Sequence, residues 1–199
     1  MTIGRWRRRQ PMASLNIMER KKILSGCWRD PLQTILSKSD RIAIIGIGRT
    51  DAGDDAAGVL IVRALMAAIP PSNNILLVDA GIAPENCTGA LRQYQPDIVF
   101  LIDAVAMDAE PGTVALLDWT QTTGLSASTH TLPLALVARY LASELNCDCR
   151  LLGLQVESCG QDLPLSQSVA TSARLVVDHI ITVLAADKAY FSERTVLKW

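Results

Sequence analysis

Residues 42–58, with the sequence IAIIGIGRTDAGDDAAG, decide the fold of this chain. The opening run IAIIGI is apolar and rich in β-branched side chains, which predicts a strand covered on both faces. The glycines and aspartates after it predict a tight turn, and the pattern from Asp55 to Ala68 indicates a helix that ends before Pro70. A buried strand that turns directly into a helix favours a parallel sheet built from strand–helix–strand units.

The same alternation of strand and helix continues along the chain. Short apolar runs predict further strands at residues 75–79, 98–103, 113–118 and 150–156. Helical patterns fill the intervals at residues 83–94, 132–145 and 166–186. The run at 113–118 alternates less cleanly than the others, so we expect it at a sheet edge. The predicted fold class is α/β, a three-layer α/β/α sandwich around a mostly parallel twisted sheet of about five strands.

The 199 residues carry a formal net charge of −1, but the charges are unevenly divided. Residues 1–41 hold ten Lys and Arg against three Asp and Glu, whereas residues 42–199 hold nine against seventeen. The hydrophobic content of 49% and charged content of 20% are those of a globular protein rather than a disordered one. We expect a basic N-terminal extension with a short helix starting at Asp30, then one domain, then a C-terminal tail, at residues 1–40, 41–187 and 188–199.

Membrane spans, export signals and disulfide frameworks are not expected. No apolar run approaches the roughly 18 residues of a span, and the N-terminal arginines lack the hydrophobic segment of a signal peptide. The five cysteines are an odd number without C-x-x-C spacing, which favours reduced thiols and a cytoplasmic setting. Cys147 and Cys149 could offer thiolates to a soft metal, but packed or solvated thiols are the favoured interpretation. The favoured interpretation of the Arg5–Arg9 tract is a solvated N-terminal leader, and no nucleic-acid partner is expected.

Acidic residues collect where the expected strands end. Asp55 follows the first strand, Asp79 ends the second and Asp103 ends the third. Open parallel sheets bind ligands at this edge, and His130 follows the fourth strand toward the same cleft. Asp55, Asp103 and His130 together would suit a divalent ion such as nickel or zinc. Each of the three also has a plainer explanation as a helix cap or loop residue, and spacing alone does not choose between these interpretations.

Other site chemistries find weaker support. The turn at Gly46 and Gly48 departs from the dinucleotide fingerprint, because Asp51 occupies the third glycine position and would repel a pyrophosphate. The sequence has neither a Walker A motif nor a Gly-x-Ser-x-Gly nucleophile elbow. Since His179 falls inside the last expected helix, a hydrolytic triad would depend on His130 without a recognisable nucleophile.

Several short motifs occur in order between residues 41 and 186. They are Gly46-x-Gly48, Gly53-Asp54-Asp55-x-x-Gly58, Asp79-Ala80-Gly81-x-Ala83-Pro84-Glu85-Asn86, Asp103-Ala104, Pro111-Gly112 and Ser128-Thr129-His130-x-x-Pro133-Leu134. Together they resemble the hydrogenase maturation endopeptidases, and the Ala-Pro-Glu-Asn and Thr-His-x-x-Pro-Leu segments resemble the hydrogenase 3 branch most. Each motif alone is unspecific, whereas their shared order is specific.

The resemblance implies an activity, a substrate and a set of site residues. Enzymes of this family remove a C-terminal extension from the large-subunit precursor of a NiFe hydrogenase after nickel has been inserted. The precursor then supplies the nickel, and the resemblance assigns both metal binding and catalysis to Asp55, Asp103 and His130. Asp79 and Glu85 are candidates to support these residues, with loop capping as the alternative. We expect a cytoplasmic monomer.

Arg49 departs from the family pattern, which usually has Asn at this position. A cation beside a cation site costs Coulomb energy, so we expect Arg49 to point away or to pair with Asp51 or Asp54. Two other functions stay open: a non-enzymatic, nickel-dependent chaperone that binds the hydrogenase precursor, and a nucleotide-binding α/β domain.

Overall fold

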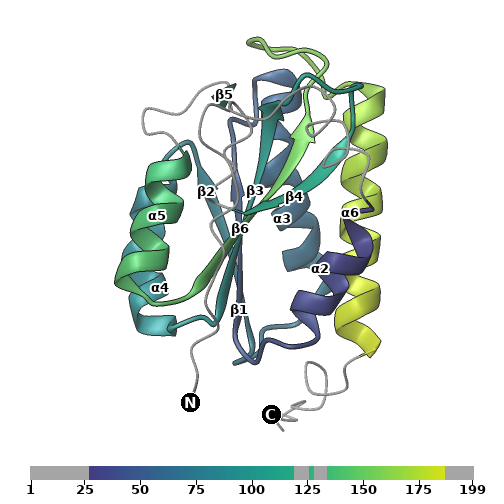
Figure 1. Ribbon diagram of the computed structural model, residues 1–199. Helices are drawn as coiled ribbons and strands as arrows, with labels where there is room; N and C mark the ends of the chain where they lie inside the picture. Colours follow the sequence, from purple (N-terminus) through teal and green to yellow (C-terminus); the bar gives the residue numbers. More distant parts are fainter. Residues whose placement is uncertain (1–26, 119–125, 128–133, 187–199) are drawn as a thin grey trace, which may run out of the picture.

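The computed structural model describes residues 27–118, 126–127 and 134–186. Its central sheet lies between two layers of helices, as Figure 1 shows, and this confirms the predicted three-layer α/β sandwich. One layer contains α4 (Thr88–Tyr94) and α5 (Leu134–Glu144). The other layer contains α2 (Arg29–Leu36), α3 (Ala57–Ala68) and α6 (Gln167–Ala186).

The sheet has the strand order β2-β1-β3-β6-β4 within the described residues. These strands are β1 (Ile42–Ile47), β2 (Ile75–Gly81), β3 (Ile98–Ala106), β4 (Val114–Asp118) and β6 (Asp148–Gln155). All neighbours pair in parallel except β4, which lies antiparallel to β6 at the edge, as its less regular pattern predicts. A further short strand, β5 (Ser126–Ala127), pairs antiparallel with the end of β3 and was not predicted.

Alternate residues of the strands supply two apolar cores, one on each face of the sheet. In β1, Ile42 and Ile44 pack toward α3 and α6, while Ala43, Ile45 and Ile47 pack toward α4 and α5. All of β1 is buried, which explains its unbroken apolar sequence.

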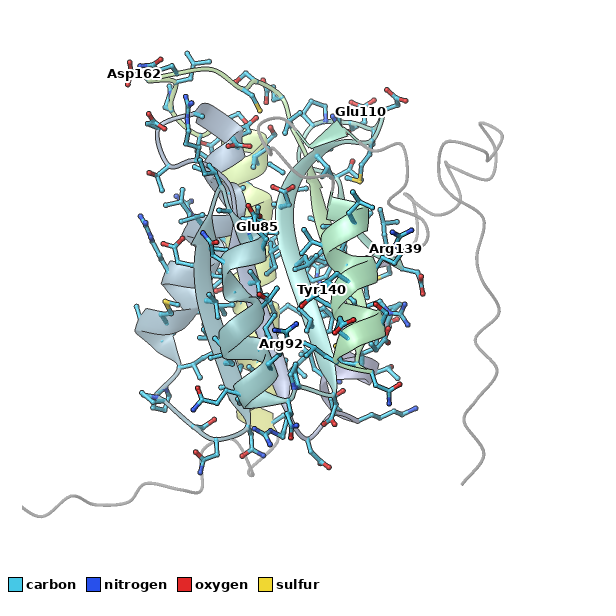
Figure 2. All side chains as sticks on the ribbon, turned by 90° about the vertical axis from the view of Figure 1, so that its left-hand side faces the viewer. Glu85, Arg92, Glu110, Arg139, Tyr140 and Asp162 are labelled. Carbon is cyan, nitrogen blue, oxygen red and sulfur yellow. The ribbon has the colours of Figure 1, made fainter. Side chains whose placement is uncertain are left out.

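The helices α4 and α5 contact each other through Arg92 and Tyr140. Arg92 of α4 points toward Tyr140 of α5 in Figure 2, and its guanidinium carbon lies 5.8 Å from the centre of the Tyr140 ring.

Helix α6 is the one described helix whose length and apolar composition would allow it to cross a membrane. Its buried residues recur every three or four positions and pack against the sheet and α3. A core helix of this kind meets the same criteria, so the finding is weak evidence for a span.

Helix α2 packs into the same core as the sheet, and it confirms the predicted short helix near Asp30. Leu32 and Leu36 are fully buried, and the Trp28 ring meets the His179 ring of α6 edge-on at 5.3 Å between centroids. The packed fold therefore includes residues that precede position 41. The three-part division of the chain stays a prediction, because its end segments extend outside the described residues.

Two strands run beyond the carboxylates that were expected to end them. β2 continues past Asp79 to Gly81, and β3 continues past Asp103 to Ala106. Aspartate disfavours strands, but the ladder between β3 and β6 continues to Val105 and outweighs that local preference. The two helices expected at residues 55 and 83 also differ, since each begins as a 3-10 turn, η2 (Gly53–Ala56) and η3 (Pro84–Cys87).

Helix α3 approaches the sheet unusually closely at its first turn. A Cβ atom on Gly58 would lie 2.1 Å from the carbonyl oxygen of Ile102 and 2.4 Å from that of Ile47. Both neighbours are strand backbone, which cannot move aside cheaply. Glycine at position 58 therefore lets the helix rest directly on β1 and β3.

We predict that Gly58→Ala lowers the free energy of unfolding by about 1–3 kcal/mol, because the added methyl group overpacks this contact. Gly89→Ala is the matched control, since a Cβ at Gly89 meets no atom within 4 Å. The control should leave stability unchanged or raise it by up to about 1 kcal/mol, because alanine is a better helix former. Urea unfolding followed by circular dichroism measures both variants, and equal stabilities would contradict the prediction.

Candidate functional site

The candidate site lies at the carboxyl ends of the parallel strands. This end carries the loop after β1, the turn η2, and the segment from residue 157 to 166 that joins β6 to α6. Figure 2 shows Asp162 of that segment and Glu110 of the loop after β3 at this end of the molecule, with Arg92 toward the other end. Open α/β sheets bind their ligands at this edge, so the predicted location agrees with the topology.

Asp55 lies in η2 and is fully buried. Its Oδ2 atom accepts the backbone N–H of Arg49 at 2.7 Å, so the loop after β1 wraps around this carboxylate. The side chain of Arg49 points elsewhere and pairs with Asp51, with 2.8 Å between Nε and Oδ1. The expected pairing of Arg49 with an acidic neighbour is thus confirmed, and it is the exposed Asp51 that takes this role.

Asp103 lies inside β3 and is also fully buried. Its register partner in β6 is Gly153, and its neighbours Leu101 and Val105 on the same side of the strand belong to the core beneath α4 and α5. The Oδ1 atom of Asp103 accepts the backbone N–H of Ala104 at 2.9 Å. The turn η2 contacts β3, so the segments that carry Asp55 and Asp103 are neighbours at this edge.

His130 lies outside the described residues, as does its predicted contact with the two carboxylates. Among the residues that the structure does describe, no three His, Cys, Asp or Glu side chains form a group that could hold a metal ion. A complete protein-derived site would therefore need a ligand from outside this part of the chain, and the assignment of Asp55, Asp103 and His130 stays a prediction.

The two supporting candidates lie in different surroundings. Asp79 binds Arg63 of α3, with 2.7 Å between Oδ2 and Nε, and its Oδ1 atom accepts the N–H of Gly81 at 3.1 Å. Asp79 thus caps the end of β2. Capping was the alternative to a supporting role that the sequence left open for this residue. Glu85 is exposed on η3 and is labelled in Figure 2.

Asp54 is a buried carboxylate that the motif analysis did not single out. Its Oδ2 atom accepts the backbone N–H groups of Glu157 and Ser158, both at 2.8 Å, and its Oδ1 atom accepts that of Ser166 at 2.7 Å. Burial raises the pKa of Asp54, but the hydrogen bonds from Ser158, Ser166 and Glu157 outweigh it and hold the pKa below its usual value. The one sequence signal for Asp54 is that it stands next to Asp55. Neighbouring side chains of a 3-10 turn point in different directions, so two adjacent acids in such a turn reach different surroundings.

The cysteine pair at the start of β6 lies away from this edge, in the core beneath α5, with Cys147 just before the strand and Cys149 within it. Cys147 and Cys149 are buried, and the Sγ atom of Cys147 lies 3.7 Å from the carbonyl oxygen of Leu141. Burial raises the pKa of Cys147 to about 11 and that of Cys149 well above its usual value. Both are therefore packed, protonated thiols, which confirms the interpretation favoured from the sequence.

We predict that iodoacetamide near neutral pH labels Cys27 and Cys159, which are exposed, and spares Cys87, Cys147 and Cys149. The buried thiols lack both access and thiolate character, because burial raises the pKa of all three. Mass spectrometry of peptides from the folded protein checks the pattern, and denatured protein serves as the fully labelled control. Rapid labelling of Cys149 in the folded state would contradict the packing described.

The fold and this edge define a class of protein. It is a three-layer α/β protein in which buried carboxylates gather at the ligand-binding edge of a parallel sheet. The chain belongs to the hydrogenase maturation protease family, whose model HycI matches residues 59–183. Members of this family are peptide-bond hydrolases.

Curated and solved relatives agree with this assignment. The hydrogenase 3 maturation protease of Escherichia coli K12 is 29% identical over 141 residues, which cover 69% of this chain and 86% of the relative. The crystal structure of the NiFe hydrogenase maturation protease HycI from Thermococcus kodakarensis KOD1 matches with a TM-score of 0.72 and 32% identity. That match covers 78% of this chain and 99% of the other.

A second structural relative is the hydrogenase maturating endopeptidase HybD from Escherichia coli. It is 25% identical with a TM-score of 0.62, and the match covers 73% of this chain and 93% of that chain. These relatives confirm the resemblance seen in the motifs, including the likeness to hydrogenase 3 enzymes. They favour a peptidase over a precursor-binding chaperone or a nucleotide-binding domain.

Proposed function

We propose that this protein is the endopeptidase that removes the C-terminal extension from a nickel-loaded large-subunit precursor of a NiFe hydrogenase. Family membership supports the reaction and the class of substrate. The single structural observation that supports the site is the burial of Asp55 and Asp103 on neighbouring segments at the carboxyl edge of the sheet. Hydrolysis adds water across one peptide bond, which leaves a new carboxyl end on the large subunit and releases the extension.

Nickel enters this proposal as part of the substrate. Carboxylate oxygens and an imidazole nitrogen suit a divalent first-row ion. Buried carboxylates cost free energy unless hydrogen bonds or a counter-charge compensate them, and a cation supplied by the precursor would provide that charge. The precursor would then dock well only when it carries the metal, so Asp55 and Asp103 would act as a checkpoint for nickel insertion.

The chain length permits His130 to join these carboxylates. Ala127 of β5 pairs with Val105 of β3, which lies two residues beyond Asp103. His130 follows Ala127 by three residues, a span of at most about 11 Å when fully extended. An imidazole at this position can therefore reach the same edge of the sheet as Asp103.

We further infer that the enzyme works in the cytoplasm as a monomer. Buried, protonated thiols and the lack of any disulfide within the described residues suit a reducing compartment. A protein substrate needs an open surface around the site, and a monomer leaves that surface accessible.

We predict that the purified protein shortens the nickel-loaded precursor and leaves the nickel-free precursor intact. Intact-mass spectrometry measures loss of the extension directly. Equal cleavage of both forms would contradict the checkpoint. Stable binding of the loaded precursor without any change in its mass would instead indicate a chaperone.

The rate of precursor processing should distinguish substitutions of the proposed ligands from substitutions of neighbouring residues. Asp55→Asn, Asp103→Asn and His130→Ala should each slow processing by roughly 100-fold or more, because each removes a metal ligand. Asp51→Ala is the control, since this side chain is 54% exposed and pairs with Arg49. It should process the precursor at nearly the normal rate. A normal rate in Asp103→Asn would remove this residue from the site.

A further inference from the structure

Asp54 ties together two segments that are more than a hundred residues apart in the sequence. Its carboxylate accepts N–H groups from Glu157, Ser158 and Ser166, and the backbone N–H of Asp54 donates in return to the carbonyl oxygen of Ser158 at 3.0 Å. The N–H of Gly53 adds a bond to the carbonyl oxygen of Leu163 at 3.1 Å. Side chain and backbone therefore fasten η2 to the segment between β6 and α6.

Each of the joined segments leads to one of the proposed metal ligands. The turn η2 carries Asp55 as the residue after Asp54. The segment from residue 157 follows β6, whose Gly153 lies in register with Asp103 of β3. The link through Asp54 thus connects the backbone that carries Asp55 to the strand beside Asp103.

The local geometry makes this link stiff. In a 3-10 turn, successive side chains are separated by about 120°, so Asp54 and Asp55 leave the backbone in different directions. Any rotation of the turn that moves Asp55 must also stretch the bonds of Asp54, which measure 2.7 to 2.8 Å and involve an ionised acceptor.

We propose that Asp54 is a positioning residue for the peptidase reaction: it holds Asp55 at a fixed place relative to Asp103. This inference rests on the proposed function, because it takes these two residues as ligands of the nickel in the substrate. Both oxygens of Asp54 accept hydrogen bonds from Glu157, Ser158 and Ser166, so we assign Asp54 no direct contact with the metal. Residues that orient metal ligands affect metal affinity and rate about 10- to 100-fold.

The test uses Asp54→Asn in the full-length protein, at a temperature where circular dichroism shows the native fold. The amide nitrogen of Asn cannot accept an N–H group, so in either orientation the turn loses the bond from Ser166 or those from Glu157 and Ser158. We expect kcat on the nickel-loaded precursor to fall about 10- to 100-fold and KM to rise, because docking of the precursor depends on its nickel. Titration calorimetry with Ni²⁺ alone should show a similar loss of affinity relative to the unaltered protein.

Asp97→Asn is the matched control. The Oδ2 atom of Asp97 also accepts two backbone N–H groups, from Asp40 at 3.0 Å and Arg41 at 2.8 Å, but at the opposite end of the sheet. This variant removes one carboxylate charge without touching η2, and its amide oxygen can still accept both N–H groups, so it should keep the normal kcat and Ni²⁺ affinity.

A second variant covers the case in which Asp54→Asn does not fold. A Cβ atom on Gly53 would lie 2.8 Å from the carbonyl oxygen of Ser158, and Gly53 has a φ of +63°. Gly53→Ala should therefore loosen the same junction without removing a carboxylate, and it should lower kcat in the same direction.

The outcomes are distinct. If the unaltered protein does not shorten the nickel-loaded precursor, the proposed function fails. If it does, and a folded Asp54→Asn or Gly53→Ala variant matches Asp97→Asn in kcat and Ni²⁺ affinity, the positioning role is overturned.

Discussion

The close approach of helix α3 to strands β1 and β3 is the constraint on which the candidate site depends. Gly58 leaves no room for even a methyl group between the helix and the carbonyl oxygens of Ile47 and Ile102. Since η2 runs directly into α3, this contact also sets the height of Asp54 and Asp55 above the sheet. The position of the acidic residues is thus a by-product of how tightly one helix packs.

The two adjacent acids illustrate how neighbours in sequence can take different roles. Both are fully buried, a state that a carboxylate tolerates only with compensating interactions. Asp54 finds its compensation in three N–H groups from one distant segment. Asp55 accepts the N–H of Arg49 in the loop next to it. Asp54 is therefore held by a segment distant in the sequence, whereas Asp55 is held by the loop next to it.

Much of this architecture could be predicted from the sequence, because local patterns determine it. The apolar run of β1 indicates a fully buried strand, and the irregular alternation at 113–118 indicates an edge strand. The ends of β2 and β3 could not be predicted, since pairing with distant strands extends them past Asp79 and Asp103. The role of Asp54 was inaccessible for a similar reason: its hydrogen-bond donors lie 103 to 112 positions away. A motif shows that two acids are present, but not which one faces which segment.

The contact between α2 and α6 has a consequence for how the chain acquires its structure during synthesis. The Nε2 atom of His179 lies 3.1 Å from the carbonyl oxygen of Arg29, a residue 150 positions earlier. Chains emerge from the ribosome at about 5–20 residues per second, so α6 is synthesised many seconds after α2. During that interval Leu32 and Leu36 lack the core that later buries them. Among the described helices, the last to be made therefore closes the core around the first.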